Sequence, residues 1–199
     1  MRAYVVFCHP THASFAGAAL ERTLAGLEAA GHEVRLTDLY ADGFAPELSA
    51  EVLQHQLVDH RGHPELRPGI QPYVDHLLWC DALVLVYPTW WSGQPAMLKG
   101  FFDRVFVKGV AWDMSDGSDR VRPRLRNVRR LVVVTSHGSP KHTNMVQGES
   151  GKRIVGRALR VLCNVRCRTR WVALYNIDRA DESTRRRFLD QVEQRLRRL

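Results

Sequence analysis

Two adjacent tryptophans, Trp90 and Trp91, follow an apolar run that ends in Tyr87-Pro88, and Pro95 then opens an amphipathic helical pattern. Loops at the carboxyl end of a buried strand are where open α/β sheets bind their ligands. The indoles could pack beside a flat aromatic ligand, and backbone amides of the loop could meet its polar edge. A flavin ring fits this description. The alternative is that both tryptophans serve a core or a subunit interface.

A second polar segment runs His9-Pro10-Thr11-His12-Ala13-Ser14-Phe15, directly after the first apolar run. Ser14 can cap a helix, and hydroxyls, imidazoles and free amides at a helix amino end suit a phosphate group. The sequence has no G-x-G-x-x-G motif after this strand and no Walker lysine motif, which disfavours a dinucleotide Rossmann site and a P-loop nucleotidase. A plain capping turn is the alternative interpretation.

A third polar segment, Thr135 to His142, ends another apolar run. Amides, hydroxyls or a cation here could meet the pyrimidine end of a flavin, where negative charge builds on reduction. His142 is a candidate for a catalytic role, although a single histidine is more often structural or solvated.

Five apolar runs are predicted strands that position these segments: Ala3–Cys8, Glu33–Asp38, Ala82–Tyr87, Leu131–Thr135 and Arg170–Tyr175. Strand–helix alternation predicts an α/β fold with a doubly wound parallel sheet. Right-handed crossovers favour the flavodoxin-like order 2-1-3-4-5, with helices on both faces. The first, third and fourth strands are then neighbours, so the three polar segments should converge at one sheet edge.

Helical patterns separate the predicted strands: one opening at Ser14, one near Pro72–Cys80, one opening at Pro95, one over Ile154–Leu162 and one capped by Asp181. Residues 40–70 and 113–128 are rich in turn formers and are expected to be irregular.

Length and composition predict one domain over residues 1–199, with 45% hydrophobic and 25% charged residues. No segment approaches the ~20 apolar residues of a membrane span. The short apolar start, broken at His9-Pro10, does not match a signal peptide. We therefore expect a cytoplasmic protein without an integral membrane segment. Its cysteines lack the second pair that a zinc site needs, so no metal is expected.

The net charge of +8 comes largely from arginines beyond residue 120, in clusters from Arg120 to Arg130 and from Arg153 to Arg170. Nucleic-acid binding is one interpretation, but no helix-turn-helix, zinc finger or aromatic RNA-binding motif accompanies the charge. Steering of phosphorylated nucleotides is another interpretation. A solvated basic surface is favoured, and no nucleic-acid partner is expected.

Together these residues resemble the NAD(P)H:quinone oxidoreductases of the flavodoxin-like fold, the group that includes mammalian DT-diaphorase, bacterial modulator of drug activity B and the ancillary oxidoreductases of potassium-efflux systems. The resemblance covers residues 3 to about 175. Its motifs are His9-Pro10 with Ser14-Phe15, Tyr87-Pro88-x-Trp90-Trp91, the run from Pro95 to Phe106, Gly109-Val110-Ala111-Trp112, and Gly138.

The resemblance implies a bound flavin and a homodimer with active sites at its interface. NADPH or NADH would give hydride to the flavin, and a quinone, azo or nitro compound would then take two electrons, in a ping-pong mechanism. The implied phosphate contacts are His9, Thr11, Ser14 and Phe15; the implied ring contacts are Pro88, Thr89, Trp90, Trp91, Ser136, His137 and Gly138. Trp112 would wall the substrate pocket, and Lys141 is a candidate for a 2′-phosphate contact.

The chain departs from the family pattern at three places. Ser136-His137-Gly138 stands where the family often has Thr-Gly-Gly, and Ala16 stands where it has asparagine. The second change favours FMN over FAD as the cofactor. Ser150 replaces a family histidine, and His142 or Asn144 could replace the hydrogen bond of a family tyrosine. His142 and Asn144 are therefore the predicted catalytic residues.

Three other functions remain open from the sequence. A flavodoxin-type electron carrier is disfavoured because such carriers are usually acidic, whereas this chain has a charge of +8. An ancillary subunit of a membrane transporter, with the flavin as a sensor, would need an exposed apolar patch beyond the dimer face. A nucleic-acid-binding protein would show salt-dependent binding to DNA without any bound flavin.

Overall fold

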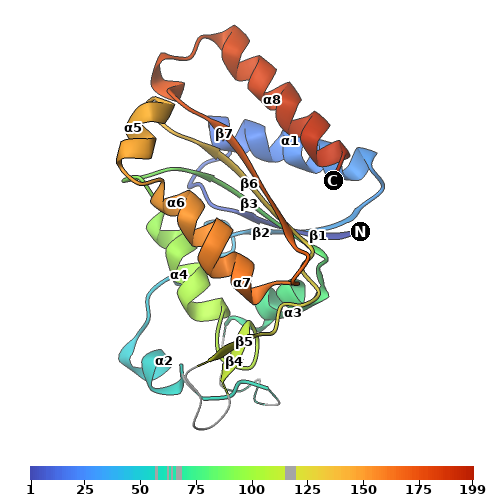
Figure 1. Cartoon of the computed structure of the whole chain (residues 1–199), viewed down its shortest axis with the longest axis vertical. Helices are drawn as coiled ribbons and strands as arrows, with labels where there is room; N and C mark the ends of the chain where they lie inside the picture. Colours follow the sequence, from blue (N-terminus) through green and yellow to red (C-terminus); the bar gives the residue numbers. More distant parts are fainter. Residues whose placement is uncertain (57, 62, 64, 66–68, 115–119) are drawn as a thin grey trace.

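A computed structural model of the chain describes residues 1–56, 58–61, 63, 65, 69–114 and 120–199. A five-stranded parallel sheet has the order β2-β1-β3-β6-β7 (Figure 1). Its strands are β1 (Arg2–Phe7), β2 (Glu33–Asp38), β3 (Ala82–Pro88), β6 (Arg130–Ser136) and β7 (Arg168–Leu174). The predicted flavodoxin-like sheet order is confirmed, with strand ends shifted by one or two residues.

Helices cover both faces of the sheet, because alternate side chains of its strands point to opposite sides. Ala3, Val5 and Phe7 of β1 pack in the cluster that contains α1 (Phe15–Ala29) and α8 (Glu182–Arg197). Tyr4 and Val6 pack in the other cluster, against α3 (Gln71–Trp79) and α4 (Ala96–Val105). Both faces are therefore dry, which explains why the central strands are continuous apolar runs.

The predicted helix over 154–162 is part of a longer helical segment. It comprises α6 (Ser150–Arg153), the π-helical segment η2 (Ile154–Leu159) and α7 (Arg160–Leu162). Its buried side chains, Val155 and Leu159, join the same cluster as α3 and α4. Figure 1 shows this segment beside α4 on one face, while α1 and α8 lie side by side on the other.

The prediction that residues 40–70 and 113–128 are irregular was wrong in part. A short helix, α2 (Ala50–His55), and a hairpin, β4 (Trp112–Met114) with β5 (Val121–Pro123), lie within or beside these stretches. Helix α2 buries none of its residues, so it carries no apolar periodicity that could reveal it. The hairpin strands have three residues each, too few for an alternating pattern to register. Two other short elements, α5 (Lys141–Val146) and η3 (Ile177–Arg179), were also missed.

The helix caps predicted from sequence are present. The Ser14 hydroxyl accepts the Gly17 amide at 3.0 Å at the start of α1. Asp181 accepts the Thr184 amide at 2.7 Å at the start of α8. Cys8, Cys80, Cys163 and Cys167 are all buried free thiols. Within the described ranges, we find no helix that is both long and apolar enough to cross a membrane.

Candidate functional site

Three loops meet at the carboxyl edge of the sheet, as the strand order requires. We call them loop 1 (residues 9–14), loop 2 (89–95) and loop 3 (137–140). The Thr89 amide donates to the Ser136 carbonyl at 2.8 Å, which joins loop 2 to the end of β6. The rings of His9 and Trp90 have centroids 6.1 Å apart, which brings loop 1 beside loop 2. The site therefore draws on β1, β3 and β6 together.

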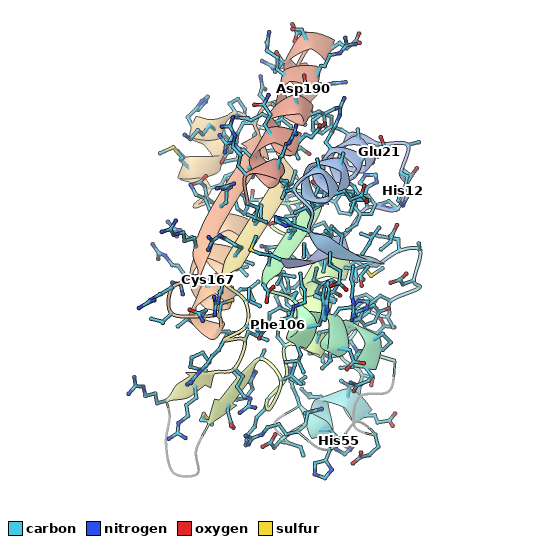
Figure 2. The ribbon with its side chains drawn as sticks, turned by 90° about the vertical axis from the view of Figure 1, so that its right-hand side faces the viewer. His12, Glu21, His55, Phe106, Cys167 and Asp190 are labelled. Carbon is cyan, nitrogen blue, oxygen red and sulfur yellow. The ribbon has the colours of Figure 1, made fainter. Side chains whose placement is uncertain are left out.

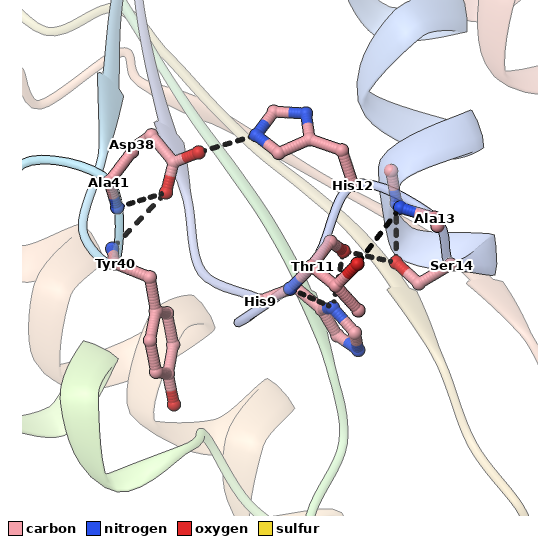
Figure 3. Close-up of polar contacts among 9 residues, drawn as sticks. His9, Thr11, His12, Ala13, Ser14, Asp38, Tyr40 and Ala41 are labelled. Atoms are coloured by element: carbon pink, nitrogen blue, oxygen red, sulfur yellow. Dashed lines mark hydrogen bonds and ion pairs between the residues drawn. The ribbon is translucent and has the colours of Figure 1, made fainter.

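Loop 1 is folded by its own polar side chains (Figure 3). The Ser14 hydroxyl donates to the Thr11 carbonyl at 2.8 Å, and the Ala13 amide donates to the Thr11 hydroxyl at 3.1 Å. His9 Nδ1 lies 3.1 Å from the Thr11 amide. His9, Thr11 and Ser14 thus lie together, and their side chains shape the loop.

A hydrogen bond between an imidazole and a carboxylate ties loop 1 to the neighbouring strand. His12 Nε2 lies 2.6 Å from Asp38 Oδ2, and the other carboxylate oxygen accepts the amides of Tyr40 and Ala41 at 3.1 Å (Figure 3). The loop also presses on the helix that follows it: a Cβ at Gly17 would lie 2.0 Å from the His12 carbonyl oxygen. Glycine is therefore required at position 17 for loop 1 to lie where it does.

The amino end of α1 offers free backbone donors. The first turn of a helix leaves amides without intrahelical acceptors. The Ser14 side chain and carbonyl take the amides of Gly17 and Ala18, which leaves those of Phe15 and Ala16 as the first-turn donors. Such amides, at the positive end of the helix dipole, favour an anion. The Phe15 ring itself packs on Phe188 of α8, with centroids 5.8 Å apart.

Loop 2 turns sharply at its two consecutive left-handed residues, Trp91 (φ 48°) and Ser92 (φ 60°). Trp90 and Gly93 exchange both backbone hydrogen bonds around this turn, at 3.1 and 3.0 Å. Neither central residue is glycine, so the conformation is strained and its surroundings must hold it. The turn leaves the Trp91 side chain fully exposed and Trp90 40% exposed. Aromatic surface is therefore available at this edge.

Three side-chain hydrogen bonds hold loop 2 against the end of α5 and the start of α6. The Ser92 hydroxyl donates to Gln147 Oε1 at 2.8 Å, and Gln94 Nε2 donates to the Gly151 carbonyl at 2.9 Å. The Ser150 hydroxyl donates to the Ser92 carbonyl. From sequence, Ser150 was expected only to mark a departure from the family pattern, and Gln94 and Gln147 had no expected role. Spacing carries no signal for these pairs, because the partners are more than fifty residues apart.

Loop 3 is built around His137, which is 5% exposed. Its Nδ1 lies 2.8 Å from Asn144 Oδ1, and its ring stacks on Tyr175. Burial lowers the pKa of His137, and the hydrogen bond with Asn144 opposes this only in part, so the ring is neutral at pH 7. Asn144 Nδ2 donates to the carbonyls of Ser139 (3.0 Å) and Pro140 (2.9 Å). Both polar side chains thus fix the shape of loop 3.

A carboxylate missed by the sequence analysis lies beside this network. Glu149 accepts a hydrogen bond from the Tyr175 hydroxyl at 3.0 Å, and the Lys152 ammonium lies 3.0 Å from its other oxygen. Burial raises the pKa of Glu149, but the hydrogen bonds from Lys152 and Tyr175 outweigh this and lower it below its ordinary value. Glu149 is therefore ionised at neutral pH and holds the segment after α5 against the end of β7.

The remaining predicted residues lie around or apart from the loops. Gly138 lies beside Asp178, whose exposed carboxylate would have to move for a Cβ at position 138, because its Oδ2 would lie 2.6 Å away. Lys141 and His142 are exposed on α5. Trp112 lies on the β4–β5 hairpin, where its indole N–H donates to the Phe106 carbonyl at 2.8 Å. Figure 1 shows that hairpin at the opposite end of the molecule from α5. Trp112 is therefore not part of its own chain's three-loop site.

A small cavity lies between α1, β3 and β6. It is lined by residues that include Phe15, Tyr87 and Ser136 and has a volume of only about 10 Å³. A ring-sized ligand does not fit in this cavity.

Comparison with known proteins agrees with the fold. A family model described as Flavodoxin-like fold matches residues 1–198. An uncharacterised NAD(P)H oxidoreductase of Haemophilus influenzae is 32% identical over 138 residues, covering 69% of this chain and 66% of that protein. NAD(P)H dehydrogenase [quinone] 1 of Rattus norvegicus is 31% identical over 150 residues, covering 69% of this chain and 54% of that protein.

A solved NAD(P)H:quinone oxidoreductase from Methanothermobacter marburgensis is 29% identical and superimposes with a TM-score of 0.82, covering 99% of this chain and 96% of that one. The chain thus spans between about half and two thirds of the curated relatives and nearly all of this solved one. The chain therefore belongs to the Flavodoxin_2 family of the flavodoxin-like fold.

Proposed function

We propose that this chain is a flavin-dependent NAD(P)H oxidoreductase that reduces quinone-like acceptors by two electrons. The observation that carries the proposal is the convergence of three loops at one edge of the sheet. Loop 1 leads into the free amides at the start of α1, and loop 2 carries the exposed indoles. An anion site and an aromatic surface are the two features that a flavin mononucleotide needs. The names of the relatives support the nicotinamide donor and the quinone-like acceptor.

The phosphate end of a flavin fits loop 1. The amides of Phe15 and Ala16 lie at the amino end of α1. The first turn of this helix is held in place because the Ser14 hydroxyl accepts the Gly17 amide at 3.0 Å. The hydroxyls of Thr11 and Ser14 lie at the same place. Ala16 adds no polar side chain to this site, so FMN is the proposed cofactor and FAD the alternative.

The ring end fits loops 2 and 3. Trp90 and Trp91 present exposed aromatic surface, and residues from Pro88 to Trp91 and from Ser136 to Gly138 supply backbone groups to a ring edge. Thr89 lies close to loop 3, with its hydroxyl 3.5 Å from His137 Nε2. When bound, the flavin supplies hydride transfer from NAD(P)H to the acceptor in a ping-pong sequence.

The protein's own part in this reaction is to position the ring and the substrates. His137 and Asn144 fix the shape of loop 3, so Asn144 is proposed as a positioning residue. His142, exposed on α5, is the proposed residue for proton transfer at the acceptor. Lys141, beside it, is the proposed contact for the nucleotide phosphate.

A homodimer is part of the proposal. Trp91, Met145 and Val146 are exposed by 103%, 60% and 89%, and the Ser92–Gln147 hydrogen bond joins loop 2 to the end of α5 that carries the last two. An apolar patch beside a ligand site suits a subunit interface. Trp112, remote from the loops of its own chain, would then wall the partner's substrate pocket. The proposed location is the cytoplasm, where four free buried thiols persist.

The visible spectrum of the purified protein tests the proposal. We expect absorption near ~450 nm that bleaches on anaerobic addition of NADPH or NADH and returns when a quinone is added. If the absorption does not return when a quinone is added, or if NADPH and NADH bleach it only very slowly, quinone reduction is contradicted and an electron carrier is favoured. A colourless protein that takes up neither FMN nor FAD contradicts the flavin assignment. Light scattering on the same sample tests the dimer.

A further inference from the structure

The amino edge of the sheet, opposite the three loops, carries a hollow of about 890 Å³. Four arginines line it, Arg129, Arg130, Arg166 and Arg168, together with the amide of Asn164. Arg130 and Arg168 begin β6 and β7, and a seven-residue strand spans about 20 Å. The hollow is thus separated from the carboxyl-edge site by the length of the sheet. Its volume is in the range of ordinary ligand sites.

These four guanidinium groups have no acidic partner among the residues that the structure describes. None of the ion pairs there involves them. Asp81 approaches the hollow, but its carbonyl accepts the amides of Arg129 and Arg130, and its carboxylate pairs with Arg2 at 3.0 Å. The positive charge of the hollow is therefore not neutralised from within the described structure.

Three hydrogen bonds of Asn164 fix the wall that carries the arginines. The backbone amide of Asn164 donates to the Val128 carbonyl at 3.1 Å, and the side-chain nitrogen of Asn164 donates to the Arg126 carbonyl at 2.8 Å. Its side-chain oxygen accepts the Arg166 amide at 3.0 Å. The turn before β7 is thus held against the turn before β6. The arginine backbones are positioned before any ligand arrives, which lowers the entropy cost of binding.

A second hollow of about 590 Å³ adjoins the first and shares Asn164 and Val165 with it. It adds two more arginines, Arg126 and Arg160, and the Arg160 guanidinium donates to the Val165 carbonyl at 2.7 Å. In Figure 2, nitrogen-tipped side chains project outward beside the labelled Cys167 at this edge of the sheet. Six arginines therefore gather on two joined hollows.

Guanidinium groups bind phosphate and carboxylate oxygens alike through two parallel hydrogen bonds. A cluster of them favours a phosphate-rich ligand over a single carboxylate, because such a ligand carries more charge and more acceptor oxygens. No tryptophan, tyrosine or phenylalanine lines either hollow, so bases of a single-stranded nucleic acid would have no ring to stack on. A concave site also suits a compact ligand better than a flat lipid surface. The features favour a small molecule with several negative charges.

We propose that the arginine-lined hollow binds a small soluble molecule carrying two or more phosphate groups. The site is distinct from the proposed flavin site and does not depend on it. Phosphodiester chains and anionic lipid headgroups share the same phosphate chemistry, and the experiment separates them.

Calorimetric titration with inorganic tripolyphosphate tests this proposal. The variant R129Q/R166Q removes two exposed guanidinium groups whose side chains make no hydrogen bond within the described structure. The matched control, R186Q/R187Q, removes the same charge from the exposed surface of α8, where the ion pair of Arg186 with Glu182 is itself exposed. Unchanged melting temperatures confirm that both variants fold. A 12-nucleotide single strand and vesicles containing phosphatidylglycerol are titrated in parallel.

We expect one equivalent of tripolyphosphate to bind to the unchanged protein and to the control alike. In R129Q/R166Q we expect affinity to fall about tenfold or more, because two charge-assisted contacts are lost. Absence of binding, or equal loss in both variants, overturns the proposal. Binding of the oligonucleotide or the vesicles but not of tripolyphosphate also overturns it and assigns the surface to that macromolecule or membrane.

Discussion

The imidazole of His137 lies parallel to the phenol ring of Tyr175, with ring centroids 4.5 Å apart and an interplanar angle of 12°. This stack joins loop 3 to the residue that follows β7. Asn144 holds the imidazole by a hydrogen bond at Nδ1, and Glu149 accepts a hydrogen bond from the phenol hydroxyl of Tyr175. His137 is thus built into the support of the proposed site.

The first prediction concerns pH and stability. Burial lowers the pKa of His137 in the folded chain below its ordinary value of 6.5. As pH falls below about 6.5, the unfolded chain binds a proton that the folded chain does not, so folding stability is present above that pH and lost below it. We expect the melting temperature to fall between pH 7.5 and 5.5, and to fall less steeply in His137→Gln.

Melting curves at several pH values provide the measurement. At pH 7.5 the variant should be less stable by about 1–3 kcal/mol, because it loses the ring stack and leaves Asn144 poorly paired. His142→Gln, at an exposed position on α5, is the control and should follow the unchanged protein at every pH. An unaltered slope in His137→Gln would show that other groups cause the pH dependence.

The second prediction concerns the packing of loop 1 on α1. A methyl group at Gly17 would lie 2.0 Å from the backbone carbonyl oxygen of His12, which cannot move aside without moving the loop. Gly17→Ala should therefore cost about 1–3 kcal/mol of stability. It should also weaken FMN binding, because the phosphate donors shift with the loop.

Gly156→Ala is the matched control for this change. A Cβ at that position meets nothing within 4 Å, and alanine favours helical backbone, so stability should hold or rise slightly. Thermal unfolding and fluorimetric FMN titration measure both effects. Normal FMN affinity in Gly17→Ala would show that loop 1 does not hold the cofactor.

The third prediction separates two helix caps of the same chemistry. Ser14 caps the fifteen-residue α1, and Ser49 caps the six-residue α2, where its hydroxyl accepts the Val52 amide at 3.2 Å. Removing a serine cap costs about 1 kcal/mol when the helix is packed. Ser14→Ala should show this loss, together with weaker FMN binding.

Ser49→Ala should lose much less stability, because α2 buries none of its residues and contributes little to the folded core. Chemical denaturation of both variants gives the comparison. Equal losses in the two variants would mean that α2 is more tightly coupled to the core than its exposure indicates.

The sequence predicted those parts of the structure that depend on continuous burial or on local chemistry. Strands β1, β3 and β6 are apolar because both of their faces are covered, and the caps at Ser14 and Asp181 depend on residues three positions away. The convergence of the three loops followed from strand order alone. Parallel topology therefore placed the site before any side chain was examined.

Other parts were beyond sequence reasoning for physical reasons. The hydrogen bonds from Ser92 to Gln147 and from Gln94 to the Gly151 carbonyl join groups 55 and 57 positions apart, and these groups contribute to no hydrophobic periodicity. The left-handed turn at Trp91 has no glycine to announce it. The burial of His137 depends on Tyr175 and Asn144 closing around it, which is a property of the assembled fold.

The last prediction addresses Trp91, whose side chain is fully exposed at a strained backbone position. Removing an exposed side chain leaves no cavity, so Trp91→Ala should change stability by less than about 0.5 kcal/mol. Trp91→Gly should stabilise the folded chain by up to about 1 kcal/mol, because glycine adopts φ 48° without strain. If Trp91 serves the proposed site, kcat/KM for quinone reduction should nevertheless fall at least about tenfold in both variants.

Trp79→Ala is the contrasting control. That indole is half-buried under the Arg35 guanidinium, 4.1 Å from the ring centroid, at the amino edge of the sheet. Its loss should lower the melting temperature and leave the flavin spectrum and quinone kinetics intact. Light scattering on Trp91→Ala shows whether lost activity follows lost dimer, which would place the indole at the interface. Full activity in Trp91→Ala would remove this side chain from the proposed site, and a large loss of stability would make it structural.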